Sequence, residues 1–214
     1  ATYLSAADSA FTNNGTVNTG TATNLNTFAS VTTSATSVIV PGGTPGVGNT
    51  DIANASTVAL NGTLKLDIQS IASSTSYDKI TNSATGGGFD ITNATLDLTG
   101  IFTPLGNRNI NIVTTNATGT LTGNFASVIG LESKPRWSVN YITGTNGKVQ
   151  LIYVAEPKVT SLTSDGTIAI TEGCGGSTLV IKGTDLTGAT AVTVNGVAVA
   201  SFVVDSATQI TAIL

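Results

Sequence analysis

The sequence predicts an all-β protein with two domains, a strand solenoid over residues 1–156 and a small sandwich of strands over residues 157–214. The chain is 40% hydrophobic but only 9% charged, well below the roughly 25% charge of an average globular domain. Thr, Ser, Asn and Gly dominate the polar remainder, and these residues suit pleated strands and tight turns. Short runs of alternating apolar and polar residues separate the turn signals, which indicates strands rather than helices.

Residues 1–59 contain strand-like runs of uneven length. The Asn14-Gly15 pair marks a turn, and the Gly- and Pro-rich stretch from Pro41 to Asp51 predicts a loop. We interpret the runs between these signals as the first, irregular rungs of the solenoid.

A turn followed by apolar alternation recurs at Leu60, Thr92, Thr115 and Thr145. Asn61 and Asn93 are 32 residues apart, and Asn93 and Asn116 are 23 apart. Such spacings suit a solenoid in which each turn covers the apolar face of its neighbour and the loops differ in length. An ordinary β-sandwich with long loops is the alternative.

Alternation within these repeats predicts which side chains face the core. In "TLKLDI" the apolar residues Leu64, Leu66 and Ile68 share one face, and Lys65 and Asp67 share the other. The stretch "FDITNATLDL" has the same pattern, with four residues expected to point inward: Phe89, Ile91, Leu96 and Leu98.

The domain boundary is expected at residues 155–157, because Pro157 ends one strand and starts a new extended segment. The pattern after it predicts strands at 158–164, 167–171, 177–184, 190–194, 197–204 and 208–214. Asn195-Gly196 lies between two of these strands and is typical of a type I′ hairpin turn.

Charge and composition exclude several classes of function. The net charge is −4 and the eight basic residues are scattered singly, so the chain lacks the basic stripe that binds nucleic acid. No run approaches the roughly 20 apolar residues of a membrane-spanning helix, so we expect no transmembrane segment here. The N-terminus has no basic region followed by an apolar one, so any export signal is expected to be already removed.

Acidic side chains are the candidate catalytic groups, because the chain has no histidine. The acids Asp67, Asp78, Asp90 and Asp97 lie on or beside the rungs and could pair as in glycoside hydrolysis. Asp67 and Asp97 occupy outward positions, the usual place for a solvated charge. We therefore predict no catalytic residue.

The sequence predicts no cofactor and no dedicated metal site. Calcium is the alternative, in the oxygen-rich loops "GNTDIANAS" and "TSDGT", although neither has regularly spaced carboxylates. Cys174 is the sole cysteine and sits in a Gly-rich turn without a basic neighbour. It is interpreted as an unreactive thiol, with an intermolecular disulfide as the alternative.

The segment from Leu60 to Val154 resembles the C-terminal part of autotransporter-type passenger β-helices. The likeness is carried by "GTLKLDI", "YDKI", "FDITNATLDL", "INIVTTNATGTLTGNFASV" and "WSVNYITGTNGKVQLIYV". Tyr77-Asp78, Gly123-Asn124-Phe125 and Tyr141 sit where such passengers have an Asp after an aromatic residue, a Gly-x-Phe and a final tyrosine-bearing strand.

Residues 157–214 resemble an IPT/TIG domain, an immunoglobulin-like module, through "PKVTSLTSDG", "GSTLVIKGTDLTGATAVTVNGVAV" and "SFVVDSATQITAIL". A complete immunoglobulin-like sandwich has about seven strands, so we expect this one to lack its last strand. Either the polypeptide continues beyond this stretch, which we favour, or a neighbouring subunit donates the strand.

Two short motifs give further candidate sites. Asp-Ser-Ala at 8–10 and 205–207 is similar to the O-glycosylation acceptor of some Gram-negative surface proteins, which makes Ser9 and Ser206 candidates. We expect Trp137 to pack beside Tyr141 as an aromatic cap at the end of the solenoid. The alternative is that Trp137 is a surface or ligand contact.

Together the resemblances imply a non-enzymatic adhesin fragment, an extended stalk or ligand-presenting segment of a large secreted repeat protein on the surface of a Gram-negative bacterium. The implied partners are surface glycans, host or environmental surfaces, and a secretion machinery, often of type IX. One rival is a filament subunit that uses "ATYLSAADSAF" as a donor strand for its neighbour. The other is a carbohydrate-active β-helix enzyme, which requires two facing acids in a groove.

Overall fold

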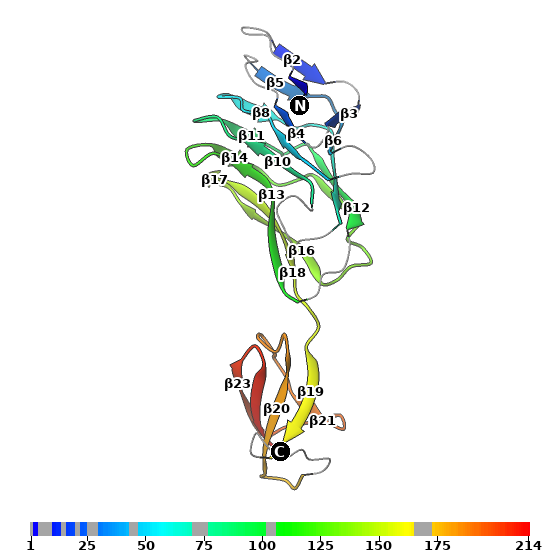
Figure 1. The fold of residues 1–214 in the computed structure, drawn as a ribbon, viewed down its shortest axis with the longest axis vertical. Helices are drawn as coiled ribbons and strands as arrows, with labels where there is room; N and C mark the ends of the chain where they lie inside the picture. Colours follow the sequence, from blue (N-terminus) through cyan, green and yellow to red (C-terminus); the bar gives the residue numbers. More distant parts are fainter. Residues whose placement is uncertain are drawn as a thin grey trace. The chain divides into compact units, whose positions relative to one another are not determined.

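The computed structural model describes residues 2–3, 10–13, 16–19, 22–24, 30–42, 47–69, 77–101, 106–164 and 173–214, with side chains from Thr32 onward. These residues form strands and turns and no helix, which confirms the all-β prediction (Figure 1). The chain divides into two compact units, Ala1–Pro104 with Arg108–Tyr153, and Leu105–Asn107 with Val154–Leu214. None of the described segments forms a helix of the length and apolar character needed to cross a bilayer.

The first unit is built from three sheets, and successive strands along the chain enter them in turn (Figure 1). Sheet A contains, in spatial order, β1 (Thr2–Tyr3), β4 (Ala22–Asn24), β7 (Asn49–Asp51), β10 (Lys79–Asn82), β13 (Arg108–Thr115), β18 (Lys148–Tyr153) and β16 (Trp137–Ile142). Sheet B contains β2 (Ala10–Asn13), β5 (Ser30–Thr33), β8 (Thr57–Ala59), β11 (Gly88–Asp90), β14 (Thr120–Thr122) and β17 (Gly144–Thr145). Sheet C contains β3 (Thr16–Thr19), β6 (Val38–Pro41), β9 (Thr63–Ile68), β12 (Thr95–Ile101) and β15 (Ser127–Ile129).

One passage of the chain through sheets A, B and C is a rung, and neighbouring rungs pair in parallel. β9 pairs with β12 so that Leu64 lies beside Leu96, and the Asn93 side-chain amide donates to Asn61 Oδ1 at 3.4 Å, 32 residues back. The 32-residue spacing is therefore confirmed as one rung. The 23-residue spacing is wrong, because Asn116 follows a strand of sheet A and donates to the Ser83 carbonyl, 33 residues earlier.

The earliest rungs follow the same order with shorter repeats. Ala10 pairs with Ser30 and Val38 with Thr63, whereas later partners such as Leu64 and Leu96 are further apart along the chain. The loop expected from Pro41 to Asp51 is shorter than predicted, because Asn49–Asp51 forms β7; residues 43–46 lie outside the described residues.

The interior of the first unit is filled by side chains stacked from rung to rung. All seven residues expected to point inward from "TLKLDI" and "FDITNATLDL" are buried: Leu64, Leu66, Ile68, Phe89, Ile91, Leu96 and Leu98. Each contributes roughly 1.5–3 kcal/mol through removal of its apolar surface from water. Lys65 and Asp67 are half-buried on the outer face, as predicted.

The second unit contains an antiparallel sheet in the order β19 (Lys158–Thr163), β20 (Thr178–Thr184), β24 (Gln209–Ile213) and β23 (Ser201–Ser206). A separate hairpin joins β21 (Thr193–Val194) to β22 (Val197–Ala198). The core combines Leu179, Ile181, Leu186, Ile210 and Ala212, with Val192 and Val199 of the hairpin region packed against it.

The hairpin turn is confirmed, because φ is 51° at Asn195 and 81° at Gly196, as a type I′ turn requires. The single strand predicted over 197–204 is wrong. The chain leaves the hairpin after Val197–Ala198 and enters the sheet at Ser201, where the Ala200 N–H donates to the Ile213 carbonyl at 2.8 Å. The strand predicted at 167–171 lies outside the described residues.

Candidate functional site

Asp78 is a fully buried carboxylate at 0% exposure, directly before β10. Its Oδ1 accepts the N–H of Gly48 at 2.7 Å and its Oδ2 accepts the N–H of Asp67 at 2.8 Å. Burial raises its pKa to about 7, although the two N–H donors act in the opposite direction; the nearby Asp67 carboxylate adds to the rise. Both oxygens are occupied by the main chain, so this acid holds segments together.

Two of the other candidate acids, Asp90 and Asp97, make short-range turn contacts. Asp97 Oδ1 accepts the N–H of Thr99 at 3.0 Å, and Asp90 Oδ1 accepts both the N–H and the hydroxyl of Thr92 at 3.0 and 2.7 Å. Within the described ranges, no group of three or more His, Cys, Asp or Glu side chains is placed to hold a metal ion. Residues 165–167 of the "TSDGT" loop lie outside the described residues.

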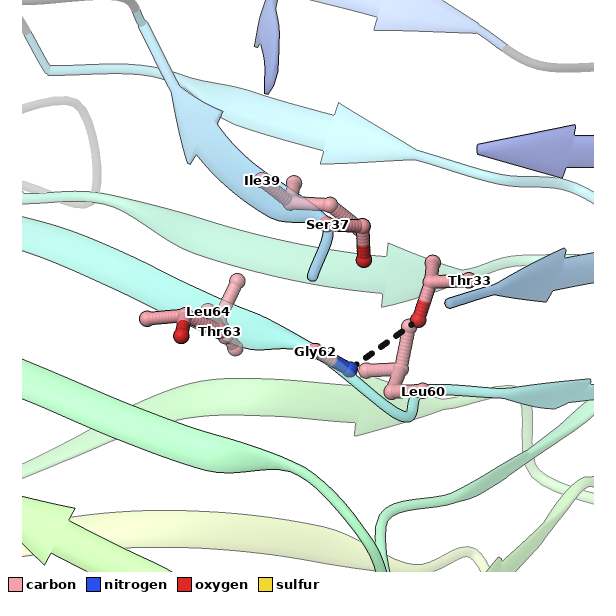
Figure 2. A pocket seen from close by; sticks show the side chains of 7 residues that line it. All are labelled: Thr33, Ser37, Ile39, Leu60, Gly62, Thr63 and Leu64. Atoms are coloured by element: carbon pink, nitrogen blue, oxygen red, sulfur yellow. Dashed lines mark hydrogen bonds between the residues drawn. The ribbon is translucent and has the colours of Figure 1, made fainter. Parts of the chain in front are cut away.

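A narrow hollow lies between rungs beside β6 and β9 and is shown in Figure 2. Its lining residues are Thr33, Ser37, Ile39, Leu60, Gly62, Thr63 and Leu64. Thr33 Oγ1 accepts the N–H of Asn61 at 2.7 Å and that of Gly62 at 3.4 Å, and the Ser37 hydroxyl donates to the Ser34 carbonyl. The space leaves no room for a water-sized molecule, so the hollow is a packing gap between neighbouring rungs.

The outer face of sheet B carries a row of short side chains. We name it the sheet B face and define it by Thr57, Ala59, Asp90, Thr120, Thr122 and Thr145. The four threonines are exposed, and Asp90 is the single charged member, with its carboxylate turned to Thr92. On sheet C the corresponding face carries Lys65, Asp67 and Asp97, so sheet B offers the less charged surface.

Aromatic residues close the C-terminal end of the first unit. The Trp137 and Tyr153 rings lie opposite each other in the antiparallel β16–β18 pair, with centroids 5.1 Å apart. Phe125 and Tyr141 form a second ring contact at 6.2 Å. The expectation that Trp137 packs beside Tyr141 is therefore wrong, because the strand register places Tyr153 opposite it.

Trp137 belongs to this packed end and is only 6% exposed, so little of its ring is available to a surface ligand. Its indole Nε1 is buried and has no hydrogen-bond partner within the part of the chain that the structure describes. Such an orphaned donor is a local cost to stability.

Of the two candidate glycosylation sites, Ser9 lies outside the described residues. Ser206 is exposed at the end of β23, where its Oγ accepts the N–H of Thr208 at 3.1 Å. Its hydroxyl therefore lies at a surface turn, and its modification stays a prediction. Cys174 is a free, exposed thiol.

The second unit exposes apolar side chains next to its core. Leu162 of β19 lies opposite the buried Ile181 of β20 but is 37% exposed, and Val159 on the same strand is 54% exposed. At the hairpin, Val197 is 70% exposed. The apolar face of the sheet thus continues onto an uncovered edge strand.

Sequence reasoning did not single out the sheet B face or the burial of Asp78. The signal for the first is the small polar residue on each side of an inward apolar one, as in Thr120-Leu121-Thr122. No local signal separates Asp78 from the other acids, because its partner Gly48 lies 30 residues away.

Comparisons with protein-family models, with curated proteins and with solved structures return no match.

Proposed function

We propose that this chain is a non-enzymatic segment of a bacterial cell-surface adhesin, in which a β-helix presents the sheet B face to a ligand and an IPT/TIG-type immunoglobulin-like unit follows. The β-helix assignment is supported by the parallel pairing of each strand from β1 to β12 with the third strand after it. The second assignment is supported by the β19-β20-β24-β23 sheet with its type I′ hairpin.

The observation that carries the proposal is the set of four exposed threonines on the sheet B face, which has a single charged member, Asp90. Thr120 and Thr145 lie side by side in the β14–β17 pair, and Thr57 lies two strands away, beyond β11. Each of these exposed hydroxyl groups can make a weak hydrogen bond to a repetitive polar surface. Many copies on one cell convert such weak contacts into firm attachment. The proposed partners are surface glycans or other host and environmental surfaces.

The extracellular location, the Gram-negative source and export by a type IX pathway belong to the same proposal. They rest on the resemblances carried by Leu60–Val154 and residues 157–214. Surface glycosylation at Ser206 would fit this location, because its hydroxyl lies in an exposed turn.

The test is retention of protein-coated beads under flow over a panel of immobilised polysaccharides. We expect retention to rise more steeply than linearly with the density of the chain on the bead. The triple variant Thr57→Lys, Thr120→Lys and Thr122→Lys places charge on the sheet B face and should reduce retention at least tenfold, about 1.4 kcal/mol of effective binding free energy.

The matched control is Thr63→Lys, Thr95→Lys and Thr99→Lys, which adds the same charge to the outer face of sheet C. It should retain beads as the unmodified chain does, and circular dichroism should show that both variants are folded. Equal loss in both triples, or retention no greater than that of uncoated beads, would contradict the proposal.

A second candidate, a filament subunit that accepts a donor strand from its neighbour, is favoured by the exposed apolar side chains of the second unit. Leu162 pairs with the core residue Ile181, and Leu162 and Val159 on the edge strand β19 would be covered by an added strand. Sedimentation over a range of concentrations tests it. Multimers of the unmodified chain that disappear in Leu162→Lys would support a filament. An unmodified chain that stays monomeric at every concentration would contradict it.

A further inference from the structure

We infer that Asp78 makes the first unit sensitive to pH, so that its stability is greatest when this side chain is protonated and declines as it ionises. The inference concerns the scaffold and is independent of what the sheet B face binds.

The geometry around Asp78 joins three stretches of main chain. Its two oxygens accept N–H groups from Gly48, just before β7, and from Asp67 on β9. Its own N–H donates to the Asp67 carbonyl at 2.8 Å, and Tyr77 bridges to Ile68. One carboxyl group therefore fixes the start of β10 against both ends of the preceding rung, at Gly48 before β7 and at Asp67 on β9.

Among the described residues the side-chain partners of Asp78 are two backbone N–H groups, and no cation is one of them. The charged group that acts on it is the carboxylate of Asp67 on β9, and this like charge favours the protonated form. The other titratable side chains on these segments are Asp51, Lys65, Tyr77 and Lys79. None of them is among the groups that shift the pKa of Asp78.

Burial raises the pKa of Asp78 from its ordinary 3.8 to about 7 in the folded chain. Between these two values the folded state binds a proton that the unfolded state releases. The free energy of unfolding therefore falls as pH rises through this window, and levels off above the folded pKa. Acidification to about pH 5 should strengthen the unit, the reverse of ordinary acid denaturation.

The chain offers a clean background for observing this effect. It has no histidine, so no side chain with an ordinary pKa titrates between about pH 5 and 7.5. It has a single tryptophan, Trp137, which lies in the first unit against Tyr153. Tryptophan fluorescence therefore reports on the unit that contains Asp78.

The experiment is urea unfolding of the whole chain, followed by Trp137 fluorescence at intervals from about pH 5 to about pH 8. We expect the urea midpoint to fall steadily as pH rises. Most of this fall should occur below about pH 7, the pKa of Asp78 in the folded chain. Asp78→Asn should have a lower midpoint throughout, because its amide faces backbone N–H groups, and should lose the dependence on pH. Asp97→Asn, at a half-buried acid that serves a local turn, should keep it.

A wild-type midpoint that is constant or rises over this range would overturn the inference, as would an unchanged pH dependence in Asp78→Asn. If that variant fails to fold, carbon NMR titration of the aspartate carboxyl groups in the unmodified protein decides the matter. The carboxyl carbon of Asp78 should titrate near neutrality. Titration of this carbon below about pH 5 would overturn the inference.

Discussion

Individual polar residues at the corners between sheets hold neighbouring rungs in register. Asn82 is fully buried; its Oδ1 accepts the N–H of Asn54 at 3.0 Å and its Nδ2 donates to the Gly88 carbonyl at 3.1 Å. One side chain thus connects its own rung to the preceding one. A hydrogen bond made inside a buried corner contributes more than an exposed one, because water cannot replace the lost partner.

Asn82→Ala should lower the free energy of unfolding of the first unit by about 2 kcal/mol, since it removes these two contacts and a third, from the Ala84 N–H, at a buried corner. Urea unfolding followed by Trp137 fluorescence measures the change. Asn93→Ala is the matched control, because Asn93 is exposed and donates one long hydrogen bond of 3.4 Å to Asn61. We expect that change to stay below about 0.5 kcal/mol; equal losses would contradict the role assigned to Asn82.

Acidic residues illustrate what the sequence leaves open at this scale. Asp67 and Asp97 were placed on the outer face from strand alternation, and both are half-buried there. Asp78 precedes a strand of the same kind but is fully buried. The difference arises from Gly48, which packs on it from the preceding rung, and local pattern carries no information about a partner so distant in sequence.

Strands are the scale at which sequence was most informative. Alternation predicts the facing of β9 and β12 correctly, because every second side chain of a strand must share a face. The 32-residue spacing also identified the partner of Asn61. The antiparallel pairing of β18 with both β13 and β16 was not predicted, because several strands have similar alternation and pairing depends on the whole stack. The wrong prediction that Trp137 packs beside Tyr141 has the same cause, because the partner of Trp137 is set by the β16–β18 pairing.

The β21–β22 hairpin gives a prediction for an element of the second unit. Asn195 has φ of 51°, in the left-handed region, so Asn195→Ala should cost about 1 kcal/mol. Amide hydrogen exchange of Ile181 and Ile210, in the core beside the hairpin region, should accelerate about fivefold if these amides exchange through unfolding of the unit. Asn195→Gly, which adopts this conformation freely, should leave their exchange unchanged. Acceleration in both variants would show that some other property of Asn195 matters.

The whole molecule is defined by its scarcity of charge. Composition alone was enough to predict an all-β chain, because Thr, Asn and Gly leave few helix-forming residues. It could not indicate where exposed polar groups gather, because that depends on which strands share a sheet. The sheet B face exists only because β8, β14 and β17 meet in one sheet with short polar residues pointing outward.

Attachment through such a surface should depend weakly on salt. The chain carries twelve acidic and eight basic residues for a net charge of −4, and Asp90 is the single charge on the sheet B face. Contacts made by neutral hydroxyl groups are not screened by ions, whereas electrostatic contacts weaken steeply as the Debye length shrinks. Bead retention should therefore change less than about twofold between about 0.05 and 0.5 M sodium chloride.

The lysine triple on the sheet B face is the internal comparison: any retention it gains on acidic polysaccharides should disappear at the higher salt. A tenfold loss for the unmodified chain would instead indicate that its few charges, and not the hydroxyl row, make the contact.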